Sequence, residues 1–257
     1  MKTFRSIYLI INYKTIIVTV LSLIATWLCM RYNIVADFPL TLVGIAIVFP
    51  VVFSIDSAYD RRERALTQLA DFEAHLTALH IATRDWLIID DDKFITKFKG
   101  NLVTLYSSLR DYFVGEDPDG TKENKINENL KILSKSVQEL REFDLPSGEM
   151  SRVNQYVSKI LVDIENLKAI YLYRTPITLR AYSRVFIYSF PVVYGPYFVF
   201  ASQNYSPGLE YMMPVLFSFI LVSLDNIQQH LENPFDQIGE DDIKFDVEKF
   251  EKSINQD

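Results

Sequence analysis

The sequence predicts an all-α fold with four transmembrane helices and a cytosolic helical bundle, on three observations. Of the 257 residues, 49% are hydrophobic, and their long uninterrupted runs lie toward the two ends of the chain. The middle of the chain, residues 59–180, is charged and carries apolar residues at the spacing of amphipathic helices. No pair of alternating apolar segments joined by a hairpin turn is found in the sequence.

These patterns divide the chain into four segments. Residues 1–58 are expected to hold membrane helices 1 and 2, residues 59–180 the cytosolic helical domain, residues 181–229 membrane helices 3 and 4, and residues 230–257 a cytosolic acidic tail. Basic residues near the span ends lie almost entirely on one side, which predicts an integral, multi-pass membrane protein with both termini in the cytoplasm. The residues on that side are Lys2, Arg5, Arg61, Arg62, Arg64, Arg174, Arg180 and Arg184, and only Arg31 lies on the other.

The first membrane helix is predicted between Lys14 and Met30, after an interfacial turn. Because Lys14 lies close to the end of this run, we expect its ammonium group to reach the membrane interface rather than to face protein. The second span is predicted over residues 34–55. Pro50 falls inside this span, and since proline removes a backbone hydrogen bond, we expect the helix to bend or break there.

Several amphipathic helices are predicted between the second and third spans. Beyond Tyr59 the apolar residues recur three or four apart, which indicates a long helix that leaves the membrane. Further helices are expected over residues 94–114, 126–143 and 151–173, separated by the loop GEDPDGT at 115–121 and the break LPSG at 145–148.

The third span is predicted over residues 182–200, where Pro191 and Pro196 both fall inside the apolar run. The fourth span is predicted from Tyr211 to about Leu224. A polar helical tail is expected to continue from there to Glu232.

A stripe of large apolar side chains marks the second span. Ile45, Phe49 and Phe53 recur every fourth residue, so at 3.6 residues per turn they lie along one face of a helix. Such a stripe is either a packing seam within one subunit or the wall of a narrow pore. The spacing alone favours the packing seam.

Three short stretches of this chain resemble the bestrophin family of ion channels. The first is F-x-x-D-S-A-Y-D-R at residues 53–61, and the second is the turn R-T-P-I at residues 174–177. The third is the box E-N-P-F, which contains Asn233, Pro234 and Phe235. The three stretches follow one another in the family's order and cover the predicted membrane core.

This resemblance implies a homopentameric channel in which Ile45, Phe49 and Phe53 form the hydrophobic neck of the pore. An apolar neck of this kind gates by dewetting. By the same resemblance Ile177 is similar to the residue at a second, cytosolic constriction. The implied partners are membrane lipid, other copies of the same chain and small inorganic ions, and a bacterial-type member is expected in the inner membrane of the cell.

The chain departs from the family pattern directly after the neck. Where the family has R-W-W-E, this chain has R-R-E-R, so Arg61, Arg62 and Arg64 place three positive charges at the expected pore mouth. These charges would attract anions, whereas the net charge of −7, from 26 Lys+Arg against 33 Asp+Glu, would favour cations in the vestibule. We therefore expect conduction of small monovalent ions with a slight preference for chloride.

The acidic tail raises the question of a calcium site. Asp236, Asp241 and Asp242 offer the carboxylate oxygens that Ca²⁺ prefers, and eukaryotic bestrophins hold calcium in this region. Here what looks like an insertion at residues 237–239 alters the spacing, and acidic tails are usually solvated. We expect no cofactor, with calcium as the weaker alternative.

Other function classes have little support in the sequence. His75 and His80 are five residues apart and do not share a helical face, while His230 is distant, so no metal triad is expected. The four-residue spacing of Asp71 and His75 predicts a surface pair. No phosphate loop, nucleophile elbow or broad basic face is found in the sequence. We expect neither an enzyme nor a nucleic-acid-binding protein. The main alternative to a channel is a non-conducting four-span scaffold or sensor that presents the cytosolic helices to a partner.

Overall fold

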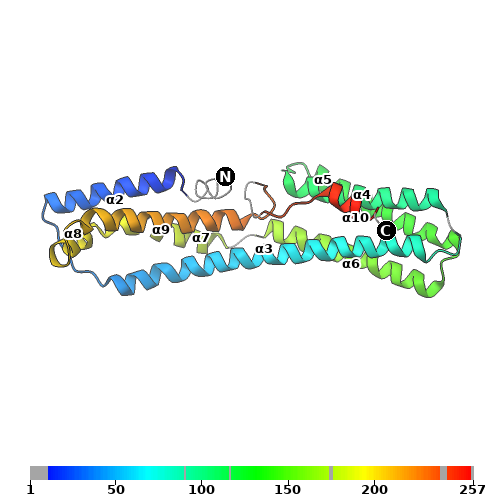
Figure 1. The fold of residues 1–257 in the computed structure, drawn as a ribbon, viewed down its shortest axis with the longest axis horizontal. Coiled ribbons are helices and arrows are strands. Elements are labelled where there is room, and N and C mark those ends of the chain that lie inside the picture. The colour runs from blue at the N-terminus through cyan, green and yellow to red at the C-terminus, as the bar shows by residue number, and fades with distance from the viewer. Residues whose placement is uncertain (1–10, 90, 116, 174–175, 238–241, 256–257) are drawn as a thin grey trace. The chain divides into compact units, whose positions relative to one another are not determined.

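The computed structural model describes residues 11–89, 91–115, 117–173, 176–237 and 242–255, and within them it contains helices and loops but no strand (Figure 1). The all-α prediction is therefore confirmed. The chain forms two compact units: unit 1 contains Met1–Arg61 with Arg174–Asn233, and unit 2 contains Arg62–Tyr173 with Pro234–Asp257. The long helix α3 (Leu40–Asp85) passes from unit 1 into unit 2.

Unit 1 contains α2 (Tyr13–Arg31), α7 (Ile177–Val193), α8 (Gly195–Asn204), α9 (Leu209–Glu232) and the first part of α3. Helix α2 packs against α7, α8 and α9, and α9 also packs against α7 and α8. The apolar faces of these helices meet in one core, which consists of Val18, Ile47, Val51, Ile187, Phe190, Tyr194, Phe198, Leu221 and Val222.

Three helices of the described chain are long and apolar enough to cross a membrane, namely α2, α3 from Val43 onward, and α9. The helix that ends at Val193 and the following α8 form an angle of 45° with each other. Together they are long and apolar enough to cross a membrane as one broken span. The predicted number of four spans is reached when this bent pair counts as one. The protein is thus an integral membrane protein by the length and composition of its helices.

The third span was predicted as one helix and is instead interrupted at Tyr194, between α7 and α8. Pro196 lies in the first turn of α8, where its missing N–H costs no helical hydrogen bond. Gly195 allows α2 to lie close to the start of α8, because a Cβ at position 195 would lie 3.3 Å from Cys29 Sγ of α2. The hydroxyl of Ser22 in α2 donates a 2.5 Å hydrogen bond to the carbonyl of Pro191 near the end of α7. Pro196 and these contacts with α2 thus lie at or beside the break.

Of the bend or break expected at Pro50, the break is not found. Helix α3 continues without interruption through this residue for 46 residues. A proline inside a long apolar helix is tolerated when the neighbouring turns keep their own hydrogen bonds. The second span and the predicted helix beyond Tyr59 are therefore one element.

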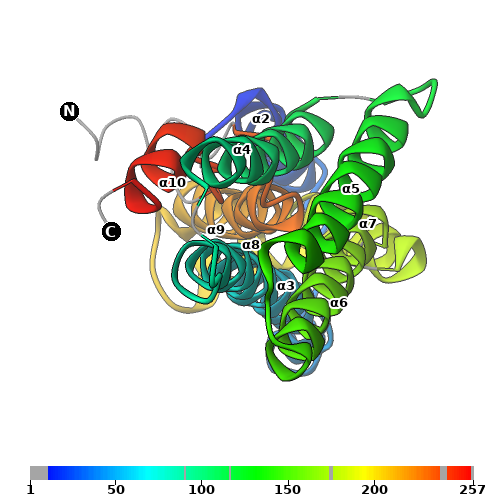
Figure 2. The same ribbon diagram turned by 90° about the vertical axis from the view of Figure 1, so that its right-hand side faces the viewer.

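Unit 2 is a bundle of the second part of α3 with α4 (Asp92–Val114), α5 (Thr121–Glu139), α6 (Ser147–Leu172), α10 (Val247–Ser253) and the 3-10 turn Leu140–Phe143. Helix α5 packs against α4 and contacts α6 (Figure 2). The predicted helices and the two predicted breaks at 115–121 and 145–148 are found here, with ends shifted by a few residues. Asp91 caps α4, since its carboxylate accepts the backbone N–H groups of Lys93 and Phe94.

Tyr106 of α4 lies at the centre of the unit 2 core. Its ring stacks on Phe250 of α10 with ring centroids 4.6 Å apart, and its hydroxyl donates a 2.6 Å hydrogen bond to Glu73 of α3. Burial, followed by this hydrogen bond to Glu73, raises the pKa of Tyr106 far above its usual value, so the hydroxyl stays a donor. Tyr106 thereby joins α4 to both α10 and α3.

Candidate functional site

The predicted neck residues occupy the exposed face of α3 in unit 1. The side chains of Ile45, Phe49 and Phe53 are 49%, 56% and 58% exposed, and the rings of Phe49 and Phe53 have centroids 5.9 Å apart. Ile47 and Val51, on the opposite face of the same helix, are buried in the core of unit 1. A packing seam within one protomer is therefore not found for this stripe, which is open to lipid, to another copy of the chain or to a pore.

The three arginines of the predicted pore mouth have different surroundings. The Arg62 guanidinium forms an ion pair with Glu63, with Nη1 and Oε1 separated by 2.6 Å. Arg64 is exposed, whereas Arg61 is half-buried. Part of the predicted positive charge is thus offset by Glu63.

Ile177 is the first residue of α7 and is 76% exposed. It follows Pro176, whose extended backbone starts the helix, as expected for a proline at a helix N-terminus. The preceding residues 174 and 175 of the R-T-P-I stretch lie outside the described residues. The exposed position leaves Ile177 available to a constriction formed by several copies.

The E-N-P-F box connects α9 to the unit 2 core. Asn233 caps the end of α9, and Phe235 is fully buried and stacks on Phe113 of α4 with centroids 4.6 Å apart. The carbonyl of Pro234 accepts a 2.8 Å hydrogen bond from the N–H of Ile243. The box therefore has a structural role, which its sequence alone does not reveal.

The calcium candidates are only partly described. Asp236 and Asp242 are half-buried, whereas Asp241 lies outside the described residues. In the portion of the chain that the structure describes, no three His, Cys, Asp or Glu side chains come together as a metal site. His75, for which Asp71 was the predicted partner, instead pairs with the buried carboxylate of Asp163, at 2.6 Å between Nδ1 and Oδ2.

A buried polar network in unit 1 was missed by the sequence interpretation. Asp225 of α9 is 1% exposed and accepts hydrogen bonds from the Tyr188 hydroxyl at 2.6 Å and from Gln229 Nε2 at 2.5 Å. Its other oxygen lies 3.4 Å from Arg184 Nε. A buried carboxylate is tolerated when it is paired and hydrogen-bonded in this way.

The same network extends to the start of α2. Lys14 Nζ donates a 3.2 Å hydrogen bond to Gln229, and the Asn12 side chain donates to Asn226 at 2.8 Å. The Lys14 ammonium group therefore faces α9, as in the alternative in which it faces protein. The signal in the sequence was the spacing of Asp225, Gln229 and Glu232, which places three polar residues on one face of α9.

Comparison of the structure with solved structures identifies the fold, whereas comparison of the sequence finds no match. No protein-family model matches the chain, and no curated protein matches it. Three crystal structures of a bacterial bestrophin homolog from Klebsiella pneumoniae are similar to it, with TM-scores of 0.82, 0.81 and 0.78. The identities are 16%, 15% and 16%, and the alignments cover 95% of this chain and 96% or 97% of the homolog. The chain therefore has the bestrophin fold.

Proposed function

We propose that the chain is a member of the bestrophin family and forms a homopentameric channel for small monovalent ions, with a slight preference for chloride. The proposal depends on one observation above all, the exposure of Ile45, Phe49 and Phe53 along a membrane-length helix of a bestrophin fold. Copies arranged around an axis would bring these side chains together as an apolar neck. Ions cross such a neck only when it widens or becomes wet.

The positive charge near the end of the apolar run favours anions. Arg64 is exposed, and the pairing of Arg62 with Glu63 reduces rather than removes the local positive charge. In this arrangement Ile177 forms the second constriction, both termini lie in the cytoplasm, and the protein resides in the inner membrane. Conduction requires no cofactor and no chemical reaction.

Ion flux from liposomes tests this function. The full chain is reconstituted into liposomes under opposed chloride and sodium gradients, and the reversal potential is measured. We expect a reversal potential shifted from zero toward the equilibrium potential of chloride. Native mass spectrometry of the same sample should show five copies of the chain in the assembly. A well-folded preparation without flux would instead support the non-conducting scaffold.

The neck itself is tested by the double substitution Phe49→Ala with Phe53→Ala. Removing both rings widens and hydrates a neck, so we expect a larger conductance or loss of gating. Val48→Ala with Val52→Ala is the matched control, since these side chains are also about half exposed on α3 but lie off the stripe. Equal effects of the two pairs on conductance would contradict the assignment.

A further inference from the structure

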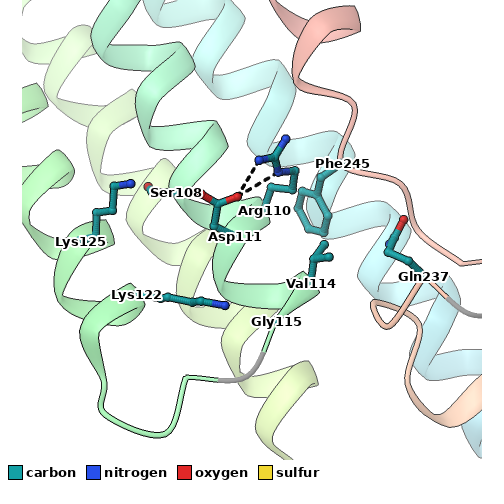
Figure 3. Close-up of a pocket in the computed structure, with 9 residues that line it drawn as sticks. All are labelled: Ser108, Arg110, Asp111, Val114, Gly115, Lys122, Lys125, Gln237 and Phe245. Atoms are coloured by element: carbon teal, nitrogen blue, oxygen red, sulfur yellow. Dashed lines mark hydrogen bonds and ion pairs between the residues drawn. The ribbon is translucent and has the colours of Figure 1, made fainter.

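A hollow in unit 2 gathers basic side chains from two helices. It has a volume of about 650 Å³ and lies between the end of α4, the start of α5 and the C-terminal segment (Figure 3). Among the described residues, the hollow is lined by the cationic side chains Arg110, Lys122 and Lys125 and by the carboxylate of Asp111. This volume is in the range of small-molecule sites, which span about 300 to 1,000 Å³. The hollow therefore has the size and the charge for a small anion.

The two lysines differ from the other buried or paired lysines of unit 2. Lys168 Nζ lies 2.6 Å from Glu123 and 2.9 Å from Glu165, so its charge is balanced. Among the residues that the structure describes, neither Lys122 nor Lys125 forms an ion pair. They are three residues apart on α5, and like charges at this spacing repel each other. A bound anion would remove that repulsion.

Gly115 gives the Lys122 ammonium group its place in the hollow. A Cβ built on Gly115 would clash with Lys122 Nζ, so a larger residue would shift this end of the flexible lysine side chain. In Figure 3 Lys122 and Lys125 extend from α5 toward the end of α4, where Arg110 lies. The absence of a side chain at position 115 therefore leaves room for the Lys122 ammonium group at this face of the hollow.

The remaining groups of the hollow suit an anion with several acceptor oxygens. Arg110 uses Nε and Nη2 to bind Asp111 Oδ1, at 3.1 and 2.7 Å. The N-terminus of α5 is already capped, since Asp117 accepts the N–H groups of Lys122 and Glu123. The anion would therefore be bound by side chains, and Lys and Arg together are the residues that bind phosphate groups.

We propose that this hollow binds a small phosphorylated molecule that carries at least two negative charges. The ligand would place its phosphate groups between Lys122 and Lys125, within reach of Arg110, and its less polar part against Val114. Binding here does not depend on ion conduction, so it is tested separately from the proposed channel.

Calorimetric titration of the full chain in detergent with pyrophosphate, at fixed ionic strength, tests the site. We expect saturable binding with a Kd below about 1 mM, weakened about tenfold or more by Lys122→Gln with Lys125→Gln. Lys131→Gln with Lys135→Gln is the matched control, because both lysines are exposed on α5 and lie outside the hollow. No saturable binding, or an equal loss in the two double variants, would overturn the proposal.

Two further variants test the geometry without removing a basic residue. Gly115→Ala should weaken pyrophosphate binding less than Lys122→Gln does, since it shifts the ammonium group without removing its charge. Asp111→Asn should strengthen it, because among the described residues Asp111 is the acidic group that lines the hollow. Weaker binding in Asp111→Asn, or unchanged binding in Gly115→Ala with native melting behaviour, would overturn the proposed geometry.

A phosphate group could also come from a lipid headgroup. The titration is therefore repeated in nanodiscs of phosphatidylcholine with and without phosphatidylglycerol. If phosphatidylglycerol lowers the apparent affinity for pyrophosphate, and Lys122→Gln with Lys125→Gln abolishes this lipid effect, the hollow binds lipid headgroups. Equal affinity in both nanodiscs assigns it to a soluble phosphorylated molecule.

Discussion

The hydroxyl of Tyr188 in α7 donates a 2.6 Å hydrogen bond to the buried carboxylate of Asp225 in α9. This contact joins two helices that lie far apart in the sequence, and Gln229 extends it to Lys14 of α2. Polar contacts between membrane helices fix their register where apolar packing alone would allow them to slide.

Tyr188→Phe should lower the stability of unit 1, because it leaves the Asp225 carboxylate with one donor fewer. We expect a loss of about 1.5 to 3 kcal/mol in the free energy of unfolding, as for a hydrogen bond to a charged group. Denaturant unfolding of the protein in detergent measures this loss. Tyr182→Phe is the control, since its side chain is on the same helix and exposed. Equal stability of the two variants would show that the bond contributes nothing.

Phe235→Ala should destabilise unit 2 strongly, since its fully buried ring stacks on Phe113. The cavity and the lost transfer free energy together predict a loss of about 3 to 5 kcal/mol. Ile132→Ala, exposed on α5, should change stability by less than about 0.5 kcal/mol. Thermal melting followed by circular dichroism ranks the two variants. A native melting temperature for Phe235→Ala would refute a structural role of the E-N-P-F box.

Asp117→Asn should loosen the first turn of α5 in a pH-dependent way. The Asp117 carboxylate accepts a hydrogen bond from the backbone N–H of Lys122. This bond is the main reason that the pKa of Asp117 lies below its usual value. A carboxylate with a lowered pKa stabilises the folded state above its unfolded pKa of about 3.9, and this stabilisation is lost as the pH falls through the folded pKa. We therefore expect faster amide hydrogen exchange at Lys122 and Glu123 in the variant at neutral pH. The difference from the wild type should shrink in acid, and a difference that persists there would contradict this account.

Chelation of calcium should leave the protein unchanged. Within the described residues no three carboxylate or imidazole groups converge, and only two of the three candidate aspartates are among them. We expect the melting temperature and the liposome flux to be the same in excess EGTA and in millimolar calcium. A shift that Asp236→Asn with Asp242→Asn abolishes would instead assign calcium to the acidic tail.

Local patterns were sufficient for most of the secondary structure. The amphipathic spacing in the middle of the chain and the GEDPDGT loop place α4, α5 and α6 within a few residues, because helix periodicity and turn chemistry are local properties. The alignment of Ile45, Phe49 and Phe53 along one face of a helix also follows from periodicity. Which side of the helix faces the core does not, since both faces of α3 are apolar in this region.

The tertiary structure alone decided the features that depend on distant partners. Pro50 does not break α3, whereas the third span is broken at Tyr194, where Ser22 and Cys29 of α2 approach the chain. Lys14 Nζ donates a hydrogen bond to Gln229 of α9. The position of the Lys14 ammonium group depends on a residue 215 positions away in the chain, which its sequence neighbours do not encode, whereas Pro196 is a local signal for the break at Tyr194.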